Sequence, residues 1–170
     1  KMTGFSSVST SVKTIASAKS LSQIDITDEQ RYITNISELD RVLGGGIVKG
    51  SVVLLSGDPG IGKSTILLQI CESVCNNLNV LYISGEESPV QIKLRAKRLG
   101  VSGENVTIIS ETDTQEICEY IMSQKPELVM IDSIQTLQIS ELTSSAGSIV
   151  QVRESTNMLL RTGKSLGIPI

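Results

Sequence analysis

The sequence contains no histidine and no tryptophan, and aromatic residues make up only 2% of its 170 residues. Aliphatic side chains must therefore fill the core, and the aromatic platforms on which many proteins stack nucleic-acid bases are nearly absent. The net charge of −3 gives no general attraction to nucleic acid. Any such contact must come from a local patch or from repeated subunits.

Cysteine is also scarce. Of the three cysteines, Cys71 and Cys75 share one face of a predicted helix, and Cys118 stands apart. Without histidine or a second cysteine pair they cannot complete a zinc site, so buried thiols in a reducing cytoplasm are the expected reading. No apolar run approaches the ~18 residues of a membrane span and no signal peptide is recognisable, so no membrane contact is expected.

One glycine-rich stretch organises the rest of the chain. Residues 51–65 read SVVLLSGDPGIGKST, in which the apolar run 51–55 predicts a strand buried on both faces. Residues 57–64 fit the pattern G-x-x-x-x-G-K-[ST], and helix-compatible residues follow to about residue 74. Strand, loop and helix in this order predict a phosphate-binding loop rather than a glycine-rich turn that binds nothing.

The residue types in this loop match the chemistry of ATP. The glycines let successive backbone N–H groups point at phosphate oxygens, and the helix adds its positive N-terminal end. We expect Lys63 to reach the β- and γ-phosphates, Ser64 to ligate Mg²⁺, and Thr65 to lie beside the α- and β-phosphates. The predicted nucleotide-binding residues are Gly57, Asp58, Pro59, Gly60, Ile61, Gly62, Lys63, Ser64 and Thr65.

Strand and helix patterns alternate along the remaining chain. Buried strands alternating with helices favour a parallel sheet covered on both faces, so we predict an α/β three-layer sandwich. Residues 1–32 are expected to form a flexible linker, and residues 33–170 the core, which is cut off at the start of a fifth core strand. Further strands are predicted at 80–84, 106–109 and 128–132, and further helices at 89–99, 114–124 and 149–166.

Acidic residues follow two of these strands, at the sheet edge where such folds bind ligands. Asp132 ends its strand in the Walker B pattern and is expected to hold Mg²⁺ with Ser64. Glu86 and Glu87 follow the strand that we place next to the phosphate-loop strand; with Lys63 they form the predicted catalytic set, and Glu86 is the favoured base for the attacking water. Gln135 either senses the γ-phosphate or is an ordinary surface glutamine.

Five blocks together resemble the RadA/Sms family of bacterial recombination ATPases, which are relatives of RecA recombinases, DnaB-type helicases and KaiC-like ATPases. The blocks are LDRVLGGGIVKGS, LLSGDPGIGKST, YISGEES, LVMIDSIQTL and SSAGSIVQVRE, and the similarity covers about residues 33–170. The resemblance implies a RecA-like P-loop core. It also implies that Glu86 is the catalytic glutamate, because that residue matches the acid that ends the second strand.

The resemblance further implies a hexameric ring that uses ATP and Mg²⁺, acts as a DNA-dependent ATPase of helicase type on single-stranded DNA, and promotes branch migration with a RecA-family recombinase. The family's zinc module and C-terminal parts lie outside this sequence, so we expect this segment to bind nucleotide but to hydrolyse it poorly. A KaiC-like switch that assembles with ATP and acts on protein partners without moving on DNA is the alternative. The implied DNA-binding residues are Ser144, Ser145, Gly147, Ser148, Gln151 and Arg153.

Overall fold

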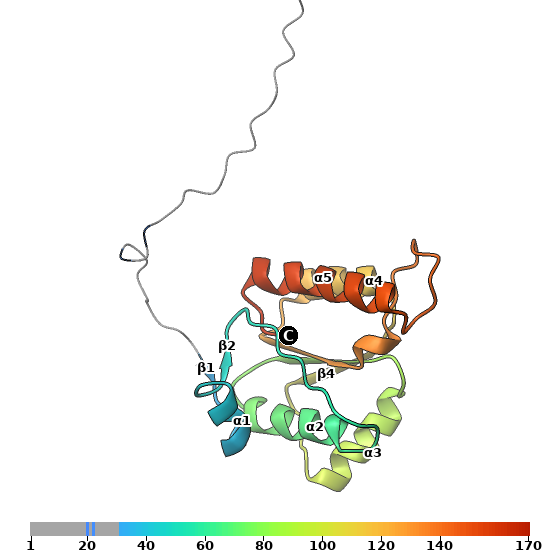
Figure 1. Cartoon of the computed structure of the whole chain (residues 1–170). Coiled ribbons are helices and arrows are strands. Elements are labelled where there is room, and N and C mark those ends of the chain that lie inside the picture. Colours follow the sequence, from blue (N-terminus) through green and yellow to red (C-terminus); the bar gives the residue numbers. More distant parts are fainter. Residues whose placement is uncertain (1–19, 21, 23–30) are drawn as a thin grey trace, which may run out of the picture.

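The computed structural model describes residues 20, 22 and 31–170 (Figure 1). Most of the predicted linker therefore lies outside the described residues. Two residues assigned to that linker form strand β1 (Arg31–Tyr32), which pairs in antiparallel fashion with β2 (Ile47–Val48). This pairing places Arg31 and Tyr32 with the core, so the predicted boundary at residue 33 is two residues too late.

A parallel sheet of three strands forms the centre of the core. The strands are β3 (Val80–Ser84), β4 (Val106–Ser110) and β5 (Leu128–Asp132), in the spatial order β4-β3-β5. Ser84 at the end of β3 lies beside Ser110 on one side and Asp132 on the other. The three carboxyl ends therefore meet at one edge of the sheet, where ligands of such folds bind.

Helices cover both faces of this sheet (Figure 1). On one face, α2 (Lys63–Val74) and α3 (Pro89–Leu99) pack on Tyr82 and Met130, with α1 (Ser37–Val42) at the side. On the other face, α4 (Thr114–Gln124) and α5 (Ile149–Leu166) pack on Ile83 and Val129. The predicted three-layer α/β sandwich is confirmed. None of the described helices combines the length and apolar character needed to cross a bilayer.

The strand predicted at residues 51–55 is not formed as expected. Apart from a bond from Ser51 N–H to the Val48 carbonyl, its described backbone hydrogen bonds join Val53 N–H to the Ile170 carbonyl, at 2.9 Å, and Ile170 N–H to the Ser51 carbonyl, at 3.0 Å. Residues 168–170 in turn lie beside β5, because Val129 N–H donates to the Pro169 carbonyl. Leu54, further along, is 78% exposed. Two hydrogen bonds do not make a ladder, so the run stays extended and partly uncovered.

This arrangement also corrects the expected place of the strand that carries Glu86. β3 is not the neighbour of residues 51–55, because β5 and residues 168–170 lie between them. The end of β5 therefore lies between Glu86 and the phosphate loop.

The cysteines behave as the sequence predicted. Cys71, Cys75 and Cys118 are all buried and free. Burial and the neighbouring Cys75 raise the pKa of Cys71 to about 12, which keeps its thiol protonated. Within the described ranges no three histidine, cysteine or acidic side chains gather as a metal site.

Candidate nucleotide site

The glycine-rich loop turns directly into helix α2. The N-cap of α2 is Gly62, with φ 105°, and Gly60 has φ 80°, both in a region that side chains disfavour. A Cβ atom added at either glycine would meet no atom within 4 Å. Backbone conformation, rather than crowding, is therefore the reason for these glycines. The two glycines and the N-terminus of α2 thus lie in the arrangement that phosphate-binding loops use.

Lys63 already closes this loop. Its ammonium group donates to the carbonyl oxygens of Gly57, at 2.8 Å, and Asp58, at 2.9 Å. Both carbonyls belong to the first turn of the loop, so the lysine holds the loop around the space that a phosphate would enter. The charge is available for a phosphate oxygen once these two bonds are exchanged.

Asp132 stands at the carboxyl end of β5, on the face that α2 covers. Its Oδ2 accepts a hydrogen bond from the phenol of Tyr82, at 2.7 Å. Burial, and then this hydrogen bond, raise the pKa of Tyr82 well above its usual range, so the phenol acts as a donor. Sequence reasoning missed Tyr82, although a tyrosine inside a buried strand is a signal because its hydroxyl must find a partner.

The two glutamates after β3 have different surroundings. Glu86 is exposed, and its Oε1 accepts a hydrogen bond from the Ser133 hydroxyl at 3.2 Å. Glu87 is half-buried and forms an ion pair with Arg95 of α3. Because Ser133 directly follows Asp132, the carboxylate of Glu86 is held at the end of β5, whereas that of Glu87 is paired with Arg95. The structure therefore favours Glu86 over Glu87 as the group that can meet a water at this edge.

Gly85 makes this approach of the two loops possible. A Cβ atom at Gly85 would lie 2.2 Å from Oγ1 of Thr136 and 2.6 Å from its Cβ. Thr136 belongs to the short 3₁₀ helix η2 (Ile134–Thr136), which follows β5. The loop after β3 can thus press against η2 only because residue 85 has no side chain. Gln135, also in η2, is exposed. Exposure is compatible both with a γ-phosphate sensor and with an ordinary surface glutamine.

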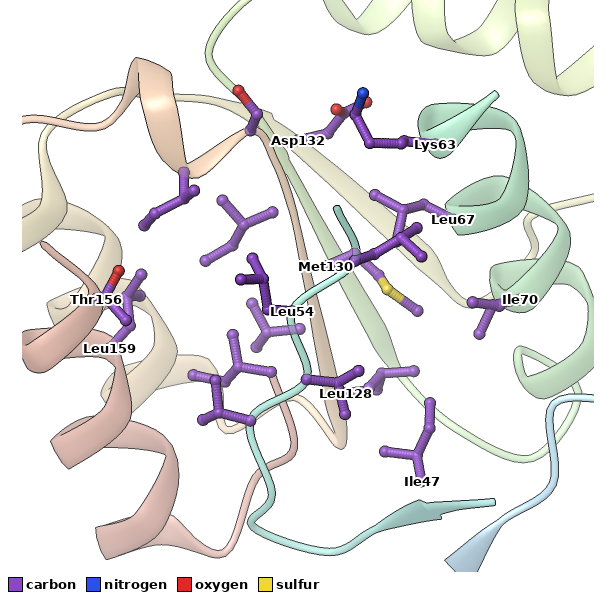
Figure 2. A pocket seen from close by; sticks show the side chains of 18 of the residues that line it. Ile47, Leu54, Lys63, Leu67, Ile70, Leu128, Met130, Asp132, Thr156 and Leu159 are labelled. Carbon is purple, nitrogen blue, oxygen red and sulfur yellow. The ribbon is translucent and has the colours of Figure 1, made fainter. Parts of the chain in front are cut away.

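An apolar cavity of about 290 Å³ adjoins the loop (Figure 2). Leu54 and the other residues of 52–55 line one side, and β5 lines the other. Lys63 and Asp132 lie together at one end of the cavity (Figure 2). Lys63, predicted to bind phosphate, and Asp132, predicted to bind the metal, thus lie at the same end of the cavity.

The predicted DNA loop, residues 140–148, is anchored at its base and open at its tip. The Gln151 amide is 1% exposed; it accepts from Ile139 N–H at 2.8 Å and donates to the Ser144 carbonyl at 2.9 Å. Ser148 caps α5 by accepting from Gln151 N–H. Gln151 and Ser148 are therefore engaged in shaping the loop, which corrects the expectation that Gln151 contacts DNA directly. Ser145 and Gly147 are exposed.

Two further residues that were predicted to contact DNA, Ser144 and Arg153, differ in how exposed their side chains are. The Ser144 hydroxyl is buried and has no hydrogen-bond partner among the described residues. The Arg153 side chain is 66% exposed and, within the part of the chain that the structure describes, forms an ion pair only with the adjacent Glu154, at 2.9 Å. Exposed pairs of this kind contribute little and exchange readily, so Arg153 remains available to a phosphate.

Asp113 ties the same loop to α4 and gives a stability prediction. Its carboxylate caps α4 through the N–H groups of Gln115 and Glu116 and accepts from the Ser140 hydroxyl. The hydrogen bond from Ser140 holds the pKa of Asp113 below its usual 3.8. We expect Asp113→Ala to lower the free energy of unfolding at pH 7 by about 1–2 kcal/mol, as for a lost helix cap.

The stability difference between wild type and Asp113→Ala should depend on pH. A lowered pKa in the folded state stabilises the fold above the unfolded-state pKa, and this stabilisation is lost as pH falls through the folded-state pKa. Urea unfolding should therefore show the gap between wild type and Asp113→Ala shrinking below about pH 4. Asp113→Asn keeps an acceptor for the cap and is the matched control, with a smaller loss at pH 7. A gap that stays constant with pH would contradict the assignment.

Comparison with known proteins agrees with this geometry. The family model described as "ATPase: KaiC" matches residues 32–112, which include the phosphate loop and both glutamates. The chain is 49% identical to DNA repair protein RadA of Bacillus subtilis over 161 residues, 94% of this chain and 35% of that protein. It is 53% identical to RadA of Listeria monocytogenes over 90% of this chain and 34% of that protein, and 42% identical to RadA of Escherichia coli over 92% and 34%.

The α/β architecture with its parallel sheet is consistent with a RecA-like P-loop ATPase fold. The resemblance to RadA proteins that the five sequence blocks indicated is confirmed over nine tenths of the chain. The chain spans about a third of the length of the curated relatives that it matches. Within this RecA-like core, the structure brings Lys63, Asp132 and Ser133 to one cavity mouth and holds Glu86 to Ser133.

Proposed function

We propose that this RecA-like chain binds ATP with Mg²⁺ and hydrolyses it in DNA repair and recombination. One observation carries the proposal. The loop that ends in Lys63, the strand that ends in Asp132 and the exposed Glu86 converge on the same edge of the sheet. The names of the similar RadA proteins supply the biological setting.

Different residues of the chain bind the phosphates and accept the proton. The N–H groups of the loop and the N-terminus of α2 bind the phosphates, and Lys63 exchanges its carbonyl partners for phosphate oxygens. Glu86 accepts a proton from the attacking water, and Ser133 holds the carboxylate by its hydrogen bond. Gln135, the middle residue of η2, lies in the chain between this edge and residues 140–148, and would pass the state of the site to that loop.

The donor set fits Mg²⁺. Ser64 in the first turn of α2 and Asp132 at the end of β5 offer one hydroxyl and one carboxylate, both oxygen donors. Magnesium in nucleotide sites is usually held by one or two protein oxygens plus phosphates and water, so two protein ligands suffice. Bound Mg²⁺ neutralises charge on phosphate oxygens.

Single-stranded DNA is the proposed activator. The open tip of the loop offers Ser145 and Gly147, and Arg153 stands in the first turns of α5 behind it. Backbone N–H groups and one arginine give a grip on phosphates without reading sequence, which suits a motor. A hexameric ring in the cytoplasm that works with a RecA-family recombinase completes the proposal, because a chain of charge −3 needs repeated subunits to bind DNA well.

A KaiC-like switch is the second candidate, favoured by the family model that matches residues 32–112. Such a protein would assemble with ATP and act on protein partners. The same Lys63, Asp132 and Glu86 would serve it, so DNA alone separates the two functions.

Steady-state ATP turnover with and without single-stranded DNA tests the proposal, in the longest natural form of the protein that contains this chain. DNA should raise turnover. Arg153→Ala should lower this stimulation and leave turnover without DNA unchanged. Arg161→Ala is the matched control, because Arg161 is exposed on the same helix but two turns further along. Turnover indifferent to DNA would favour the KaiC-like switch.

A further inference from the structure

The hydrogen bond between Tyr82 and Asp132 joins the hydrophobic core to the proposed metal side of the site. Tyr82 lies in the middle of β3, opposite Met130, and its side chain extends diagonally to Asp132 two residues further along β5. Neither residue is close to the other in the sequence. A core side chain thus fixes the direction of the carboxylate that ends β5.

The tyrosine ring cannot move away from this position. Tyr82 is 0% exposed and belongs to the apolar cluster that α2 and α3 form over this face, together with Leu68 and Cys71 of α2. Interiors packed in this way hold side chains in one rotamer. The hydroxyl is therefore presented at one fixed point, and α2, which presses on the ring, is the helix that begins at the phosphate loop.

A buried tyrosine hydroxyl needs a hydrogen-bond acceptor, but that acceptor need not be a carboxylate. Any backbone carbonyl would satisfy the hydroxyl, but the partner here is the carboxylate at the sheet edge. A carboxylate has two oxygens, and among the hydrogen bonds of the described chain only Oδ2 of Asp132 is used. Oδ1 accepts no hydrogen bond within the described chain, and Asp132 lines the cavity together with Lys63.

We propose that Tyr82 is a positioning residue for Mg²⁺: by holding Oδ2 of Asp132 it fixes the carboxylate, whose Oδ1 would then be free to bind the metal. The inference rests on the proposed function and deepens it, because it assigns the orientation of the metal-side acid to a residue of the core. Partners of this kind around metal ligands typically change metal affinity about 10-fold or more when removed.

Equilibrium binding of a fluorescent ADP analogue, without Mg²⁺ and across a Mg²⁺ titration, tests the role without turnover. Tyr82→Phe keeps the ring and removes only the hydroxyl. We expect unchanged affinity without Mg²⁺ and a Mg²⁺ midpoint about 10-fold higher than in wild type. Tyr120→Phe is the matched control on the other face of the sheet and should leave the midpoint unchanged.

A second background separates positioning from packing. In Asp132→Asn, which already lacks the charged ligand, adding Tyr82→Phe should not shift the midpoint further, because the two residues act as one unit. An unshifted midpoint in the single variant, an equal loss of binding without Mg²⁺, or failure of Tyr82→Phe to fold would each overturn the inference. If wild type binds no nucleotide at all, the proposed function itself fails, which is a distinguishable result.

Discussion

Lys63→Ala is expected to lower the affinity for MgATP by roughly 100-fold and to abolish turnover at cellular nucleotide concentrations. The size follows from losing charged hydrogen bonds to phosphate, about 2–3 kcal/mol in total. The structure adds a second cause. Without the ammonium group, the carbonyls of Gly57 and Asp58 lose the donor that holds the loop in shape. Nucleotide binding by calorimetry measures the effect.

The control for this variant is the substitution of another lysine, on a helix that covers the same face of the sheet. Lys97 is exposed in the last turn of α3. Lys97→Ala removes the same charge from the protein without touching the loop, so its affinity for MgATP should equal that of wild type. If both variants bind like wild type, the phosphate-loop assignment is wrong.

Glu86→Gln should reduce ATP turnover by roughly 100-fold or more while nucleotide binding stays intact, as expected for a lost general base. The amide keeps the size of the side chain and its hydrogen bond from Ser133, but it cannot accept a proton. Single-turnover kinetics with saturating ATP isolates this step. Glu104→Gln, at an exposed carboxylate before β4, controls for the lost charge.

Glu87→Gln is expected to behave differently. Its carboxylate is paired with Arg95, and the side chains of Arg95 and Glu87 are only 24% and 28% exposed. One guanidinium nitrogen of Arg95 is already buried without a partner in the described structure, so weakening the pair should destabilise the fold by about 1–2 kcal/mol. Thermal unfolding should detect this loss, with turnover little changed. A larger loss of turnover in Glu87→Gln than in Glu86→Gln would reverse the assignment.

The phosphate loop was predictable from sequence because its cause is local. Gly60 and Gly62 adopt positive φ angles within the motif itself, and Lys63 starts the helix that the motif requires. Asp132 and the parallel strands were predictable for a similar reason, since short buried runs between helices leave few arrangements. In these cases the pattern and the physical requirement occupy the same few residues.

The strand at residues 51–55 depended on partners that the pattern does not contain. An apolar run becomes a strand only where a neighbouring chain supplies a ladder, and here Ile170 supplies two hydrogen bonds. Leu54 consequently lies exposed at the cavity in place of the buried position predicted for it. The order of the strands, which sets β5 beside β3, is likewise a property of the whole sheet.

Side-chain partners decided the remaining differences. The sequence left Glu86 and Glu87 as neighbours of equal type, and Arg95 on α3 separates them by binding one. Gln151 matched a sequence block associated with DNA, but its amide is enclosed by Ile139 and Ser144. Such partners come from separate elements and become visible only when the elements pack.

We expect ATP phosphates to bind the loop at residues 57–64, with Glu86 beside them at the sheet edge. A crystal structure of the protein with Mg²⁺ and a non-hydrolysable ATP analogue tests it most directly. We predict that the phosphates lie on this loop and that the Lys63 ammonium has left the carbonyls of Gly57 and Asp58 for a phosphate oxygen. Phosphates bound elsewhere, or Lys63 still on both carbonyls with nucleotide present, would contradict the account.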